Sequence, residues 1–240
     1  MRHELTLKEF FRDAFPAAPS NRPRPPAPFV TVSREAGAGG HALAESLLQR
    51  FSKESGELFA GWQIFDKSLC ERVAADPDLH VSLQSLLNEE HHTGLDDLLR
   101  SLVAGVGPQN KIDHRMFRTV RGVCVLGKAI VVGRAAALIT RDLPFGVHVR
   151  LVSERKARVD RVRRETGLDA IEVGQTLDRQ DWQRAREADT YFNKDIADPH
   201  LYDCVWNADA VTFEAMAESL VGLIRRRAAR RELMEPGRSR

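Results

Sequence analysis

Residues 29–50 constrain the fold more than any other segment, because they join a strand-like run, a glycine-rich turn and a helix-forming stretch. Residues 29–32 are apolar or β-branched, as in a buried strand. Three glycines follow within four positions, at Gly37, Gly39 and Gly40. A strand, a glycine turn and a helix in this order direct backbone N–H groups and the positive end of the helix dipole at one point. The segment therefore predicts an anion site and suggests phosphate as its ligand.

The turn has the outline of a P-loop, G-x-x-x-x-G-K-[ST], but not its side chains. When Gly37-Ala38-Gly39 is placed on the end of that loop, Gly40 takes the position of the lysine. His41 then takes the position of the hydroxyl that helps to hold Mg²⁺. The missing positive charge needs another source. Arg34 and His41 are the nearest candidates in the sequence, and Arg134 and Arg184 are the others.

Composition indicates an ordinary globular protein. The chain has 240 residues, of which 42% are hydrophobic and 29% charged, so it can bury a core without disulfides or metal. No apolar run approaches the ~18 residues of a membrane span, and the N-terminus lacks a signal-peptide pattern. The three cysteines are widely spaced and match neither a disulfide framework nor a metal motif. We therefore expect a cytoplasmic protein, and no residue is assigned as a metal ligand.

The formal net charge of +2 is unevenly distributed. Residues 225–240 contain seven Arg and two Glu, a net charge of +5, which leaves −3 for residues 1–224. The body of the protein is therefore not a basic platform for nucleic acid, and we do not expect a nucleic-acid partner. The Arg-rich segment 225–240 is either a solvated end or a docking arm for another protein.

The N-terminal region divides into two segments before the main domain. Residues 1–15 predict a short amphipathic helix with Phe10, Phe11 and Phe15 on its apolar side. Residues 16–28 contain six prolines and predict an extended linker. The N-terminal helix either packs back on the domain or serves as a docking peptide for a protein partner. The main domain occupies residues 29–224.

Strand and helix patterns alternate through the main domain. Five strand candidates lie at 29–32, 62–66, 129–133, 147–152 and 201–207. Helices are expected at 42–50, 67–75, 154–166, 169–186 and 212–227, and over most of 79–121. Ser153 and Asp169 are the expected N-caps of the third and fourth of these helices. This alternation predicts an α/β fold: a parallel sheet of about five strands with helices on both faces.

Ligands of such sheets bind at the carboxyl ends of the strands. There the sequence places the glycine loop, Asp66, the Gly133-Arg134 pair and Ser153. Two Arg-rich helical stretches, at 155–164 and 178–186, either face this edge or form solvated surfaces. Arginines beside a phosphate loop suit phosphoryl transfer, which depends on positioning and on neutralising the charge of oxygen atoms.

Several motifs, taken in order, resemble one family. They are V-S-R-E-x-G-x-G-G-H at 32–41, F-D-K at 65–67, I-V-V-G-R-A at 130–135, D-x-x-R-A at 181–185 and Y-D at 202–203. Together they look like the cytidylate kinase-like family, a divergent branch of the nucleoside monophosphate kinases. The resemblance covers about residues 29–224. It implies a P-loop NTPase-like fold with a helical acceptor-binding insertion at 79–121 and a lid at 167–195.

The resemblance also implies roles for particular residues. Binding of the nucleotide triphosphate falls to Gly37, Ala38, Gly39, Gly40 and His41. The acceptor nucleotide falls to Asp66, Arg72 and Arg134. Catalysis falls to Arg34, Arg134, Asp181 and Arg184. The implied reaction moves the γ-phosphoryl group of ATP, with Mg²⁺, to a CMP-like nucleoside monophosphate or a similar small phosphorylated acceptor.

The chain departs from true cytidylate kinases at several of these positions. Gly40 and His41 replace the loop lysine and hydroxyl, Val132 replaces an aspartate, and Gln180 and Trp182 replace arginines of the lid. Two other functions therefore remain open. One is a catalytically weak or inactive nucleotide-binding module that signals through its termini. The other is a structural protein whose loop binds nothing.

Overall fold

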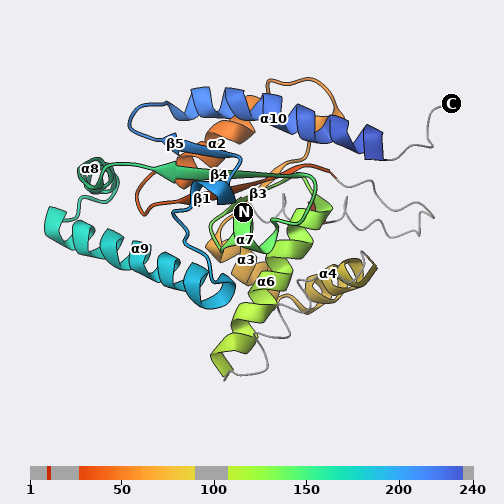
Figure 1. The fold of residues 1–240 in the computed structure, drawn as a ribbon, viewed down its shortest axis with the longest axis horizontal. Helices are drawn as coiled ribbons and strands as arrows, with labels where there is room; N and C mark the ends of the chain where they lie inside the picture. Colours follow the sequence, from red (N-terminus) through yellow and green to blue (C-terminus); the bar gives the residue numbers. More distant parts are fainter. Residues whose placement is uncertain (1–9, 12–26, 90–107, 235–240) are drawn as a thin grey trace.

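The glycine turn follows the central strand of a five-stranded parallel sheet (Figure 1). The computed structural model describes residues 10–11, 27–89 and 108–234. The strands are β1 (Phe29–Arg34), β2 (Gln63–Phe65), β3 (Ala129–Val132), β4 (Gly146–Val152) and β5 (Cys204–Asn207), in the order β2-β3-β1-β4-β5. β1 pairs in parallel with both β3 and β4. The expected α/β fold with a parallel sheet is confirmed.

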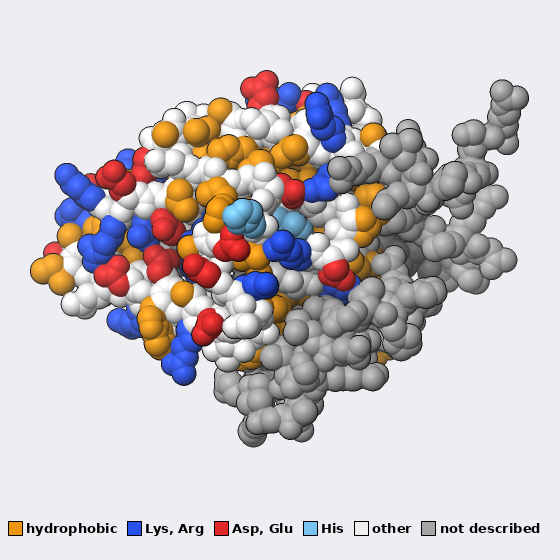
Figure 2. All heavy atoms as spheres, viewed as in Figure 1, with side chains coloured by type: hydrophobic (Ala, Val, Ile, Leu, Met, Phe, Trp, Pro, Cys, Tyr) orange, Lys and Arg blue, Asp and Glu red, His pale blue; other side chains and the backbone are white. Residues whose placement is uncertain are grey.

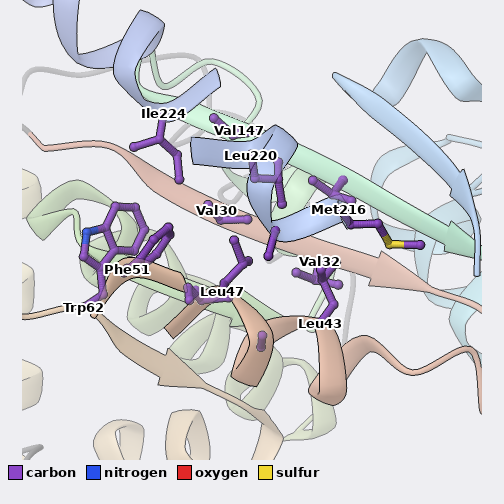
Figure 3. Packing of buried hydrophobic residues seen from close by; sticks show 14 of the residues in the cluster. Val30, Val32, Leu43, Leu47, Phe51, Trp62, Val147, Met216, Leu220 and Ile224 are labelled. Atoms are coloured by element: carbon purple, nitrogen blue, oxygen red, sulfur yellow. The ribbon is translucent and has the colours of Figure 1, made fainter. Parts of the chain in front are cut away.

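Helices cover both faces of the sheet, which explains why β3 is apolar throughout and why residues 29–32 of β1 are all buried. In β1, Val30 and Val32 point into one core, whereas Phe29 points into the other. The first core lies beneath α2 (Gly40–Phe51) and α10 (Phe213–Met234). Figure 3 shows Leu43 and Leu47 of α2 directed at β1, with side chains of α10 beside them. The helical spacing of the α2 leucines puts one apolar stripe on the sheet.

The opposite face carries α3 (Lys67–Ala75), α6 (Pro108–Leu126) and α7 (Ala136–Ile139), with α4 (Pro77–Glu89) beside α6. Phe10 and Phe11, the two described residues of the expected N-terminal helix, are helical and pack on this second core. Their rings lie 5.2 and 6.4 Å from the ring of Phe65 in β2. At these two positions, the chain therefore packs back on the domain. The remainder of 1–15, the linker up to residue 26, and residues 90–107 of the expected insertion lie outside the described residues.

Beyond the carboxyl ends of the strands lie α8 (Arg155–Thr166) and α9 (Ala170–Phe192), at the left of Figure 1. Short 3₁₀ turns at Glu57–Phe59 and Pro199–Leu201 precede β2 and β5. A small apolar cluster joins Val159 of α8 and Leu177 of α9 to Ala36 of the glycine turn. The region expected to form a lid thus packs directly on the glycine turn. Figure 2 shows basic and acidic side chains intermixed over α8 and α9.

Several boundary expectations differ from the structure, and β5 begins at Cys204 and not at Leu201. Ser153 does not cap α8, because its hydroxyl donates to Asp209 Oδ1. The N-cap residue is Glu154, whose N–H donates to Asp209 Oδ2. Asp169 caps α9 as expected, but that helix continues to Phe192. α10 continues past 227 to Met234, so the first part of the Arg-rich segment is helical. In the part of the chain that the structure describes, no helix is long and apolar enough to cross a membrane.

Candidate functional site

A cavity of about 280 Å³ opens at the carboxyl edge of the sheet, next to the glycine turn. Three arginines from separate segments line it: Arg34 at the end of β1, Arg134 after β3 and Arg184 on α9. Lys67, at the start of α3, adds a fourth positive charge. Parallel strands bring their carboxyl ends to one edge, and α9 passes that edge, so residues 150 positions apart in the sequence meet here. The cavity is therefore strongly cationic.

The positive charges of the cavity are only partly compensated. No hydrogen bond or ion pair joins the Arg34 or Arg134 guanidinium to another residue that the structure describes. Arg184 lies 3.4 Å from an Asp181 carboxylate oxygen and donates to the Arg34 carbonyl oxygen at 3.2 Å. Burial, followed by the neighbouring Arg184 and Arg134 charges, lowers the pKa of Arg34 to about 10. Arg34 is still protonated at pH 7, so the cavity holds a cationic excess that an anion would relieve.

The backbone that carries Arg134 adopts an unusual conformation. Gly133, Arg134 and Ala135 have φ values of 81°, 58° and 52°, so three consecutive residues are left-handed. For residues with a Cβ, this conformation costs about 1–3 kcal/mol each. The turn ends β3 abruptly and starts α7, and it places Arg134 in the wall of the cavity.

The glycine turn itself is held by the chain's own side chains. Gly37 and Gly39 have φ values of 75° and 87°, which explains the need for glycine at both positions. The N–H of Ala36 donates to Asp181 Oδ1 at 2.6 Å. The carbonyl oxygen of Gly37 accepts from Arg161 Nη1 at 2.6 Å. The first N–H groups of α2, from Gly40 onward, have no partner within their own helix and stay suited to an anion.

Arg158 of α8 is the centre of the contacts behind the turn. It is 7% exposed and donates to the Ser153 and Ala36 carbonyl oxygens, both at 3.0 Å. It also donates to Asp181 Oδ2 at 2.6 Å, while Glu35 lies 3.7 Å away. Asp181, expected to take part in catalysis, therefore joins the glycine turn to α8 and does not line the cavity. The sequence places Arg158 in a basic helix, but the helical pattern gives no sign that its side chain is buried.

The other residues expected to bind ligand lie outside the cavity wall. The loop residues from Gly37 to His41 form the turn and the start of α2. His41 is exposed, with Nε2 3.6 Å from a Glu45 carboxylate oxygen. Asp66 caps α3 by accepting from the Leu69 N–H at 2.8 Å, and Arg72 is exposed on that helix.

Seven polar side chains that the sequence analysis did not assign to ligand binding also line the cavity: Thr31, Ser33, Lys67, Gln180, Gln183, Glu187 and Tyr202. The Tyr202 hydroxyl lies 3.2 Å from Ser33 Oγ, to which Arg150 also donates at 3.3 Å. Lys67 and Tyr202 stood within motifs that resemble the family, so a signal for them was present. Gln180 and Glu187 lie four residues before and three residues after Arg184 on α9, so helical spacing from Arg184 could have indicated them.

The family implies Mg²⁺, so we asked whether the chain supplies ligands for it. Both oxygens of Asp181 accept hydrogen bonds from protein donors, and one oxygen of Glu35 accepts from the Ser153 N–H at 2.9 Å. Among the described residues, no group of three or more His, Cys, Asp or Glu side chains is arranged to hold a metal ion. The side chains present therefore do not form a Mg²⁺ site by themselves, and we assign no step to the metal.

Comparison with known protein families identifies the chain. Residues 29–210 match the model of the cytidylate kinase-like family. The chain belongs to the cytidylate kinase-like family. The match confirms the resemblance drawn from the motifs. It includes the glycine turn, and also the Gly133–Ala135 turn and α9, which line the cavity, and it ends before α10.

Solved structures also resemble the chain. An uncharacterized protein from Eubacterium ventriosum is 20% identical and superposes with a TM-score of 0.64, covering 82% of this chain and 97% of its own. A shikimate kinase from Bacteroides thetaiotaomicron is 12% identical, with a TM-score of 0.42 over 82% of this chain and 98% of its own. The first similarity supports the fold of this cytidylate kinase-like protein. A comparison with curated proteins gave no match.

Proposed function

We propose that the protein is a nucleotide-binding phosphotransferase that moves the γ-phosphoryl group of ATP to a small phosphorylated acceptor such as CMP. One observation carries the proposal. Arg34, Arg134 and Arg184 converge on one cavity, and the guanidinium groups of Arg34 and Arg134 make no hydrogen bond or ion pair with another described residue. Half-buried guanidinium groups repel one another, and a phosphate ester relieves this repulsion through several charge-assisted hydrogen bonds. Membership of the cytidylate kinase-like family supports nucleotides as the source of those phosphates.

In the proposed reaction, a phosphate oxygen of the acceptor attacks the γ-phosphorus of ATP. The bond from that phosphorus to the β–γ bridging oxygen breaks, and ADP leaves with the electron pair. The transferred group needs little covalent help from the protein, because catalysis of this kind is mostly positioning and charge stabilisation. The arginines of the cavity would supply that stabilisation.

Formation of ADP with a panel of nucleoside monophosphates tests the proposal. Arg184→Ala should lower the rate of transfer about 10²–10³-fold, as expected when one donor to the developing charge is lost. Arg186→Ala is the matched control, because Arg186 lies on the same helix and stacks over Trp182, 5.1 Å from the ring centre. That variant should transfer at the wild-type rate. Absence of ADP formation with every acceptor would contradict the phosphotransferase function.

A second candidate function, a non-catalytic nucleotide-binding module, is favoured by the environment of Asp181. That carboxylate is bound to the Ala36 N–H and to Arg158 and takes no part in the cavity wall. The lid also presents Gln180 to the cavity where true cytidylate kinases carry an arginine. For such a module, ATP or CMP should raise the melting temperature without any turnover. Arg184→Ala should then weaken binding only.

A further inference from the structure

The side chain of Arg34 runs across two glycines that leave its path open. A Cβ at Gly40, the first residue of α2, would lie 3.1 Å from Arg34 Cδ and 3.2 Å from Cγ. A Cβ at Gly133, just after β3, would lie 2.1 Å from Arg34 Nη1. Any other residue at 133 would displace the guanidinium. Both glycines thus direct Arg34 from the glycine turn toward the cavity.

Two departures from the P-loop pattern are complementary in space. When G-x-x-x-x-G-K-[ST] is placed on residues 34–41, Arg34 takes the position of the first glycine and Gly40 that of the lysine. The chain therefore has a cation at the first position of the loop and no side chain at the seventh. In the structure, the Arg34 side chain lies against the point where a side chain of residue 40 would begin. One change opens the space that the other fills.

The charge of Arg34 is available to a ligand. The structure shows no hydrogen bond or ion pair for its guanidinium among the described residues, and the group lines the cavity. His41, the other nearby candidate, is 58% exposed and is directed at Glu45 on the outer surface of α2. Of the two, only Arg34 combines an unpaired cation with a position beside the start of α2 and the cavity.

We propose that Arg34 supplies, from the first position of the glycine loop, the phosphate-binding charge that the P-loop pattern takes from a lysine at position 40. The ligand group is the β- and γ-phosphates of a nucleoside triphosphate. The inference rests on the proposed function, because it assumes that a nucleotide binds at this edge of the sheet. It identifies Arg34 as the source of the positive charge that the loop lacks. It also predicts that a lysine at position 40 can supply this charge when residue 34 is glycine.

The first test compares ATP with AMP, which lacks the β- and γ-phosphates, using calorimetric titration of the full chain. Arg34→Gln should weaken ATP binding about ten- to hundredfold, the loss expected for one charge-assisted hydrogen bond. AMP binding should change little. Arg186→Ala, which removes an equal charge on the outer side of α9, should leave both affinities unchanged. Equal affinities of Arg34→Gln and the wild type for ATP would overturn the inference.

The second test relocates the charge. In the double variant Arg34→Gly with Gly40→Lys, the lysine enters the space that Arg34 leaves, and ATP binding should recover most of the loss seen with Arg34→Gly alone. Gly40→Lys in the presence of Arg34 should not strengthen binding, because the two side chains compete for one space. A double variant that folds but binds ATP no better than Arg34→Gly would overturn the inference. Failure of the wild type to bind ATP would overturn the proposed function itself, and the inference with it.

Discussion

Replacement of Arg158 by methionine should strongly destabilise the protein, because one buried guanidinium holds the glycine turn, α8 and α9 together. Methionine keeps the length of the side chain but removes its charge and all its donors. The change removes the donor that the Ser153 and Ala36 carbonyl oxygens share. It also removes the ion pair between Arg158 and the partly buried Asp181 carboxylate. The protein would then have unsatisfied polar groups behind the turn.

The size of the effect follows from burial. Breaking a buried ion pair by removing one partner costs about 3–5 kcal/mol, and the lower part of that range applies because the Asp181 side chain is 29% exposed. The two carbonyl groups add about 1 kcal/mol or more each if water does not reach them. We therefore expect a loss of about 5 kcal/mol in the free energy of unfolding. For a chain of this size, that corresponds to a fall in melting temperature of roughly 10–20 °C.

Urea denaturation followed by circular dichroism measures the loss, and Arg155→Met is the control. Arg155 also joins α8 to α9, through two hydrogen bonds to Asp178, but both of these side chains are more than half exposed. Solvent screens such a pair, so Arg155→Met should leave the unfolding midpoint almost unchanged. If Arg158→Met lowered the free energy of unfolding no more than Arg155→Met does, burial would not explain the stabilising effect of the Arg158 contacts. That result would refute the reasoning.

Two further predictions concern other parts of the protein. Burial lowers the pKa of His148 to about 4, below the 6.5 of an exposed imidazole, so the unfolded chain binds a proton between these values that the folded protein does not. The free energy of unfolding should have its full value above about pH 6.5 and fall by up to about 3 kcal/mol toward pH 4. A His148→Gln variant whose free energy of unfolding depends on pH as steeply as that of the wild type would contradict this. Phe11→Ala should cost about 3 kcal/mol, because that ring is 4% exposed against the second core. A melting temperature equal to that of the wild type would show that the Phe11 ring does not stabilise the domain.

The class of fold was predictable from the sequence because it depends on local patterns. Apolar runs of strand length alternate with helical stretches, and that alternation permits only a parallel sheet between helical layers. The glycine turn after residue 34 was predictable for the same reason, since positive φ values require glycine at 37 and 39. The end of α10 was not predictable, because a run of arginines fits a solvated tail as well as a helix. In the structure, Arg225 and Arg227 pair with Glu54 and Asp203.

At the site, the sequence by itself determined which kinds of group meet, and the tertiary structure decided what each of them contacts. The order of the strands was enough to place Arg34 and Arg134 at one edge, because parallel strands end together, whereas the position of Arg184 depends on how α9 packs. The sequence could not show that Asp181 binds the turn and not the cavity, since that depends on how deeply Arg158 is buried between α8 and α9. Nor could it choose between Arg34 and His41 as the source of the missing loop charge. That choice depends on the space that Gly40 and Gly133 leave, which exists only once β1, β3 and α2 have packed.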